Sequence, residues 1–146
     1  MTQDNGFNLK IPFLADLGVR CNFMEGGRSE IELDLRERHQ NSWDMAHGGV
    51  LMTLLDVAMA VAGRSMDTDG RGVVTIEMKT SFMAPGRGKL RARGLAVHRT
   101  STMVFCEGEI VDEAGAIVSK ASGTFKYIKR KPPQRKPGSP DSGADG

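Results

Sequence analysis

Residues 47–63, HGGVLMTLLDVAMAVAG, decide how this chain folds. After the two glycines the segment is apolar around nearly the whole circumference of a helix, and it contains a single carboxylate, Asp56. A helix of that kind is buried on most sides, so the segment predicts one central core helix over residues 48–64. The apolar run is too short to cross a bilayer, which argues against a membrane span.

Alternating apolar and polar residues on both sides of this helix predict β-strands. A short helical segment at residues 9–17 precedes an expected hairpin of residues 19–24 and 31–35, and four expected strands follow the central helix at residues 74–82, 89–97, 103–111 and 116–128. Turn residues separate the last four strands, which predicts an antiparallel meander. Because one apolar helix cannot stay dry alone, we expect an α+β domain whose curved antiparallel sheet wraps around it.

Length and composition fit one ordinary globular domain. The chain has 146 residues, of which 39% are hydrophobic and 26% are charged, and this length is enough to bury a core. We expect the domain to occupy residues 1–128 and a disordered tail, rich in proline, glycine and charge, to occupy residues 129–146. The tail holds five basic and two acidic residues, a net of +3, whereas the whole chain is only +2. The domain is therefore close to −1, which argues against nucleic-acid binding.

The two cysteines indicate a reducing compartment. Cys21 and Cys106 stand alone, without a CxxC motif or a Cys/His cluster, as is typical of buried free thiols. The N-terminus is polar and has no signal-peptide pattern. We therefore expect a cytoplasmic protein with no metal site and no membrane attachment.

The start of the central helix is the candidate site for chemistry. Gly48 and Gly49 would leave backbone N–H groups at a helix N-terminus open to a ligand, where they could polarise a carbonyl oxygen. Asp56, seven residues after Gly49, faces almost the same way and could act as a general base or as a nucleophile. A structural interpretation is equally open, since Asp56 could pair with a basic residue or a backbone N–H and the glycines could serve only close packing. His47 could be a base, but a loop-orienting role is the more common one for a lone histidine.

The spacing of these residues resembles that of a known family. Asn41 is followed after six residues by His47-Gly48-Gly49, and Asp56 follows His47 after nine. This pattern is similar to the PaaI-like branch of the hotdog-fold acyl-CoA thioesterases. The similarity continues through residues 73–85 and covers roughly residues 10–128. It implies a hotdog fold and hydrolysis of an acyl-CoA thioester to a free acid and CoA.

The resemblance implies a role for each motif residue. Asp56 would be the general base or nucleophile, and the Gly48 N–H would polarise the thioester carbonyl, with Gly49 beside it. Asn41 and His47 would shape the loop, and Asn41 could also orient the attacking water or the carbonyl. The Thr75 hydroxyl would reach across a dimer interface to place the water.

The resemblance also implies a substrate and an assembly. Coenzyme A would enter as part of the substrate, with no separate cofactor, and its nucleotide would lie near two turns, Pro85-Gly86-Arg87 and Arg99-Thr100-Ser101. Arg87 and Arg99 are suited to phosphates because a guanidinium binds them in a bidentate manner. The acyl group could lie among flexible apolar side chains, of which Met24, Met52, Met59 and Phe82 are candidates. The active form would be a homo-oligomer, a dimer or a dimer of dimers.

Two other functions stay open at this stage. A hotdog enoyl-CoA hydratase would pair its Asp with a catalytic His further along the same segment, an arrangement that His39, His47 and His98 do not follow. A non-catalytic acyl-CoA-binding module would bind the thioester without releasing a thiol.

Overall fold

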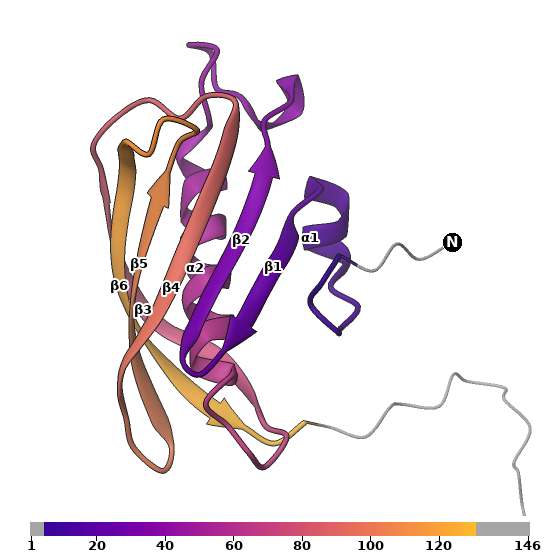
Figure 1. The fold of residues 1–146 in the computed structure, drawn as a ribbon, viewed down its shortest axis with the longest axis vertical. Coiled ribbons are helices and arrows are strands. Elements are labelled where there is room, and N and C mark those ends of the chain that lie inside the picture. Colours follow the sequence, from indigo (N-terminus) through magenta and orange to yellow (C-terminus); the bar gives the residue numbers. More distant parts are fainter. Residues whose placement is uncertain (1–4, 131–146) are drawn as a thin grey trace, which may run out of the picture.

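A curved antiparallel sheet lies over one long helix, α2, and leaves one side of that helix uncovered (Figure 1). The computed structural model describes residues 5–130, so most of the predicted tail lies outside the described residues. The elements are α1 (Pro12–Leu17), β1 (Arg20–Glu25), β2 (Arg28–Asp34), a 3₁₀ turn (Glu37–His39), α2 (Gly48–Arg64), β3 (Gly72–Phe82), β4 (Lys89–Arg99), β5 (Met103–Val111) and β6 (Ile117–Ile128). The predicted central helix, hairpin and four later strands are confirmed, with ends that differ by at most a few residues.

The order of the strands corrects the prediction of a simple meander. The sheet runs β1-β2-β4-β5-β6-β3, and all neighbouring strands are antiparallel. Only β4, β5 and β6 follow each other as a meander, whereas β3 pairs with β6 at the far edge and β2 pairs with β4. Alternation of residue types shows which face of a strand is buried, but it does not show which strand lies next to it.

The helix α2 is buried on one side and open on the other. Leu54, Leu55, Ala58 and Met59 are almost completely buried against the sheet. Their neighbours on the opposite side, Thr53, Asp56, Val57 and Ala60, are only half-buried. The prediction that α2 is buried on most sides is therefore too strong for a single chain. Met59 is a core residue and not part of an acyl pocket.

The edge strand β3 exposes large apolar side chains. Ile76 and Phe82 are each 54% exposed, and Met83 just after the strand is 56% exposed. The pairing of β3 with β6 shifts register between Thr75 and Glu77, so Ile76 is the extra residue of a β-bulge. An exposed apolar edge of this kind is the surface on which a second strand or subunit packs. Within residues 5–130, no helix is both long enough and apolar enough to span a bilayer.

Strand β4 passes very close to α2. A Cβ atom at Gly94 would lie 2.1 Å from the backbone oxygen of Ala58. The same oxygen accepts a hydrogen bond of 2.6 Å from the buried Ser29 hydroxyl on β2. The sheet can therefore approach the helix here only because residue 94 has no side chain.

We expect Gly94→Ala to destabilise the fold strongly, by about 2 kcal/mol or more, because a methyl group overlapping backbone atoms forces β4 away from α2. Urea unfolding measures the loss. Gly115→Ala is the control, because a Cβ at Gly115 meets nothing within 4 Å and should cost only about 1 kcal/mol for its left-handed backbone. Equal losses in the two variants would contradict the close packing described here.

Candidate active site

The N-terminus of α2 is capped so that one N–H group stays free. The side chain of His47, the N-cap residue, accepts a hydrogen bond of 2.8 Å from the Gly49 N–H at Nδ1. The N–H groups of Val50 and Leu51 both donate to the His47 carbonyl. Among residues 5–130 no acceptor binds the Gly48 N–H, so the capping leaves this donor available at the positive end of the helix dipole.

The space around the two glycines of this motif differs. A Cβ atom at Gly49 would lie 3.0 Å from His47 Nδ1 and would press on the cap. A Cβ at Gly48 would make only ordinary contacts, 3.6 Å from the Phe82 ring. Packing within this chain therefore does not require glycine at position 48, and a methyl group there would fit beside the Phe82 ring.

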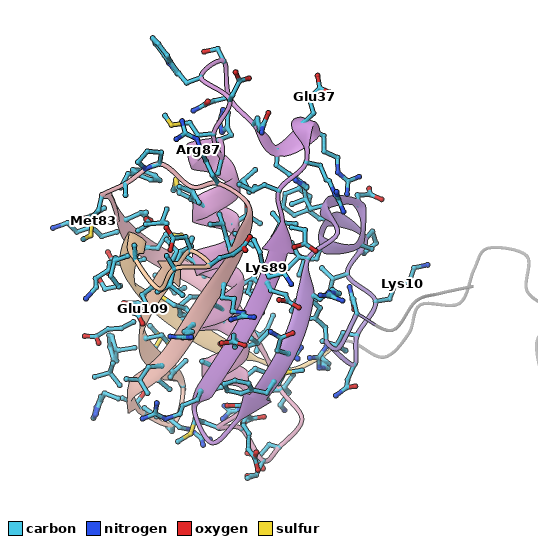
Figure 2. All side chains as sticks on the ribbon, turned by 45° about the horizontal axis from the view of Figure 1, so that its top comes forward. Lys10, Glu37, Met83, Arg87, Lys89 and Glu109 are labelled. Atoms are coloured by element: carbon cyan, nitrogen blue, oxygen red, sulfur yellow. The ribbon has the colours of Figure 1, made fainter. Side chains whose placement is uncertain are left out.

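The loop before α2 is held by Asn41. Its Oδ1 accepts hydrogen bonds from the N–H groups of Trp43 (2.9 Å) and Met45 (3.3 Å). Further along, the Ala46 N–H donates to the Gly86 carbonyl at 2.9 Å. Asn41 and His47 thus both hold the backbone next to Gly48, and the turn Pro85-Gly86-Arg87 lies beside them. Figure 2 shows Arg87 close to this end of α2.

Asp56 projects from the open side of α2 and has one hydrogen-bond partner among residues 5–130. Its Oδ1 accepts a hydrogen bond of 2.6 Å from the Thr75 hydroxyl on β3. No cation of residues 5–130 lies within ion-pair distance of this carboxylate. The interpretation of Asp56 as one half of a structural ion pair is therefore wrong for the described part of the chain. Within one chain the Thr75 hydroxyl binds Asp56, and its predicted reach across a dimer interface stays a prediction.

Gly48 and Asp56 of the same chain are too far apart to act on one carbonyl group. The two residues are eight positions apart in a continuous helix, which places them about 12 Å apart along its axis. A carbonyl oxygen bound by the Gly48 N–H is thus out of reach of the Asp56 carboxylate of the same chain, because reacting atoms must approach to about 3–3.5 Å. The spacing in the sequence correctly predicts that the start of α2 and Asp56 lie on the same face of the helix. It does not show that the distance along the helix is too long for a common reaction.

A groove of about 720 Å³ runs along the open side of α2 and includes Asp56. Its walls come from α1 and the segment before it, from α2, and from the ends of β3 and β6. The residues lining it are mainly apolar, and its cations are Arg64, Lys129 and Arg130. Arg64 is the first cation after the apolar run of α2. This position in the sequence is the signal that could have indicated a cation at the end of the groove.

The turn Arg99-Thr100-Ser101 lies at the opposite end of α2 from Gly48. The Arg99 guanidinium donates to the carbonyl of Met66, just after α2, and lies 3.6 Å from the carboxylate of Asp67 and 5.2 Å from the centre of the Tyr127 ring. The Ser101 carbonyl accepts a hydrogen bond from Arg71. Within one chain the two predicted CoA-binding turns are therefore not brought together, and Arg99 is occupied by structural contacts.

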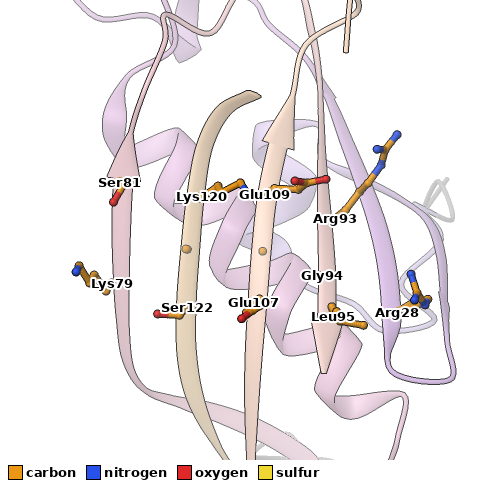
Figure 3. A pocket seen from close by; sticks show the side chains of 12 residues that line it. Arg28, Lys79, Ser81, Arg93, Gly94, Leu95, Glu107, Glu109, Lys120 and Ser122 are labelled. Atoms are coloured by element: carbon orange, nitrogen blue, oxygen red, sulfur yellow. The ribbon is translucent and has the colours of Figure 1, made fainter. Parts of the chain in front are cut away.

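A second hollow, of about 600 Å³, lies on the outer face of the sheet (Figure 3). Charges of opposite sign alternate across its strands, as in the row Glu30, Arg93, Glu109 and Lys120. The Arg93 and Glu30 side chains are 3.2 Å apart. Opposite charges in neighbouring cross-strand positions attract one another. Asp56 belongs to α2, which packs against the other face of the sheet, so this hollow is not part of the candidate site.

Comparison with known families decides the class of this chain. A family model described as "Thioesterase superfamily" matches residues 44–119, which is more than half of the chain. The chain belongs to the thioesterase superfamily. The match includes the last four residues of the loop before α2, the whole of α2 and strands β3 to β5.

Individual members of the thioesterase superfamily agree with this assignment. The chain is 30% identical to a proposed esterase of Saccharolobus solfataricus over 79% of this chain and 82% of that protein. It is 27% identical to the proofreading thioesterase EntH of Klebsiella pneumoniae over 70% and 75% of the two chains. The BH2602 protein of Bacillus halodurans, solved with CoA, has a TM-score of 0.77 and 28% identity over 84% and 82%. The predicted hotdog fold is confirmed.

Proposed function

We propose that this thioesterase-superfamily protein hydrolyses acyl-CoA thioesters at sites built from two copies of the chain. One observation carries the proposal: a free N–H at Gly48 and a carboxylate at Asp56 lie on the open side of one helix. They are too far apart to act on the same carbonyl unless a second copy supplies one of them.

A two-fold axis would solve the problem of distance. If two α2 helices lie antiparallel across such an axis, Gly48 of each copy faces Asp56 of the other, and two equivalent sites form. The exposed apolar side chains of β3, among them Ile76 and Phe82, supply a surface for this contact. The Phe82 ring also lies beside Gly48. The apolar contact between the two copies would therefore lie next to the carbonyl group that reacts.

The chemistry follows from the two groups. The Gly48 N–H, aided by the helix dipole, would stabilise the negative charge that develops on the thioester oxygen. Asp56 would accept a proton from a water molecule as the water oxygen attacks the carbonyl carbon. The C–S bond then breaks, the acid is released, and the sulfur leaves as a thiolate that takes up a proton. Thr75 would hold the carboxylate in place through its 2.6 Å hydrogen bond.

The proposal that the substrate contains CoA is supported by similar proteins. The BH2602 protein, a close structural match, was solved with CoA, and EntH is named as a thioesterase. The histidines argue against the hydratase alternative. His39 is buried with hydrogen bonds at both ring nitrogens, and the Nδ1 of His47 is bound by the helix cap.

Replacing Asp56 tests the role of the carboxylate. We expect Asp56→Asn to lower kcat by about 10²–10⁴-fold, with a much smaller change in KM, because the carboxylate acts in the transition state. Thiol release from a panel of acyl-CoA and aryl-CoA esters measures both constants. A folded Asp56→Asn protein with wild-type kcat would rule out this mechanism.

Replacing Gly48 tests the N–H group itself. Gly48 is the first residue of α2, a position where proline is well tolerated although it has no N–H. We expect Gly48→Pro to lower kcat by about 10²–10³-fold, the usual effect of losing one oxyanion donor. Gly48→Ala is the matched control, since it keeps the N–H and adds only a Cβ in ordinary contact with Phe82. If the alanine variant lost as much kcat as the proline variant, the N–H would not be the cause.

Mixing the two inactive variants tests the shared site. In a dimer of one Asp56→Asn chain and one Gly48→Pro chain, one site keeps both functional groups and the other site loses both. We expect such mixed dimers, purified with two different tags, to recover about half of the wild-type kcat per dimer, as follows from one intact site in a two-fold assembly. A site contained within one chain predicts no recovery, as does a chain that sedimentation shows to be monomeric.

A further inference from the structure

The groove beside Asp56 ends in positive charges that form no ion pair with a carboxylate of the described residues. Arg64, Lys129 and Arg130 line this end. Among residues 5–130 no Asp or Glu lies within 4.0 Å of any of these three cations. Glu25 lines a smaller adjacent hollow together with Arg64 and Arg130, but it forms an ion pair with neither.

Arg64 is held in place by neutral groups. Its Nη2 donates to the Phe7 carbonyl at 3.1 Å and lies 2.9 Å from the sulfur of Met24. Burial lowers the pKa of this guanidinium, and the nearby charge of Arg130 lowers it further. A half-buried cation next to a like charge is costly, and an anion would relieve that cost.

Arg130 stands against the wall of the same groove. A Cβ atom at Gly72 would lie 3.9 Å from its Cζ and its Nη2, so the guanidinium lies over the start of β3. Some other cations have carboxylate partners: Arg71 and Arg99 share Asp67, and Arg91 and Lys89 share Glu32. Arg64 and Arg130 differ from isolated surface cations because they lie near each other at the end of one groove, where a single anion can contact both.

We propose that Arg64 and Arg130, with Lys129 beside them, bind an anionic group of the thioester substrate that lies in this groove. The proposal rests on the proposed function. Asp56 and Arg64 are eight residues apart on α2, which puts the anion site about 12 Å along the helix from the carboxylate. Val57, Ala60 and Val73 line the groove between them.

Two parts of a substrate carry an anion at such a distance from the thioester. One is a phosphate of CoA, reached through the pantetheine arm. The other is a carboxylate at the far end of the acyl chain, for which the apolar groove walls would hold the methylene groups. Both would meet the two guanidinium groups in the same way, through charge-assisted hydrogen bonds.

The test uses Arg130→Gln in the full chain, with Arg28→Gln as the matched control. Arg130 is exposed and its removal leaves Arg64 in its contacts, whereas Arg28 lies in the hollow on the outer face of the sheet. The substrates are a CoA ester, the corresponding pantetheine ester, which has no phosphate, and pantetheine esters of monocarboxylic and dicarboxylic acids of equal length.

We expect Arg130→Gln to raise KM about ten-fold for substrates with the bound anion, the size expected for one charge-assisted hydrogen bond. The kcat and all Arg28→Gln constants should stay near wild type. A rise for the CoA ester but not for its pantetheine ester assigns the anion to a CoA phosphate. A rise for the dicarboxylic pantetheine ester but not for the monocarboxylic one assigns it to the acyl chain. Equal changes for all esters, or none, would overturn the proposal.

A binding measurement separates this site from the proposed catalysis. Calorimetry with CoA, pantetheine and a dicarboxylic acid needs no turnover. We expect wild-type protein to bind CoA or the dicarboxylic acid more tightly than Arg130→Gln does, and the difference to shrink as salt concentration rises. If that difference is found but no thiol is released, the anion site stands and the hydrolysis proposal fails. If thiol is released but binding does not depend on Arg130, the anion site fails alone.

Discussion

The burial of α2 on one side only is the constraint on which the rest of this structure depends. The apolar helix must be covered, and the sheet covers the side that carries Leu54, Leu55 and Met59. The close approach of β4 at Gly94 brings the sheet onto the helix. Because the sheet curves around one side, Asp56 and the start of the helix remain on the uncovered side, where a ligand or a second copy has access.

The candidate site consists of backbone N–H groups at the start of α2 and one carboxylate, that of Asp56. At the N-terminus of α2, His47 takes up the Gly49 N–H and leaves that of Gly48, so a donor is fixed in place without a bulky side chain. Within the described part of the chain Asp56 is bound by Thr75 alone, through one carboxylate oxygen, and this hydrogen bond orients the carboxylate. Such prearranged dipoles cost little reorganisation during a reaction, which suits the polarisation of a carbonyl. The apolar groove and its terminal cations extend this arrangement from the reacting group to the remainder of a substrate.

Much of the fold could be predicted from local sequence. The errors of that prediction have one cause, which is that local sequence does not show which segments lie side by side. The strands were predictable because side-chain alternation reports burial, and α2 was predictable because it is a long apolar run. The place of β3 beside β6 was not, since both strands alternate in the same way as their neighbours. The same limit applies to the site: the turn at Arg99 carries suitable residues for phosphate, but Asp67 and Tyr127 occupy its guanidinium.

The sequence by itself determined the elements and the motif: one apolar helix, six strands, and the spacing of Asn41, His47 and Asp56 that resembles the thioesterases. These features depend on neighbours along the chain, where helix and strand periods act directly. Only the tertiary structure decided that the Gly48 N–H is the free donor, that Thr75 binds Asp56, and that Arg64 and Arg130 close one groove. Each of these depends on groups brought together from distant parts of the chain, and no local period encodes such contacts.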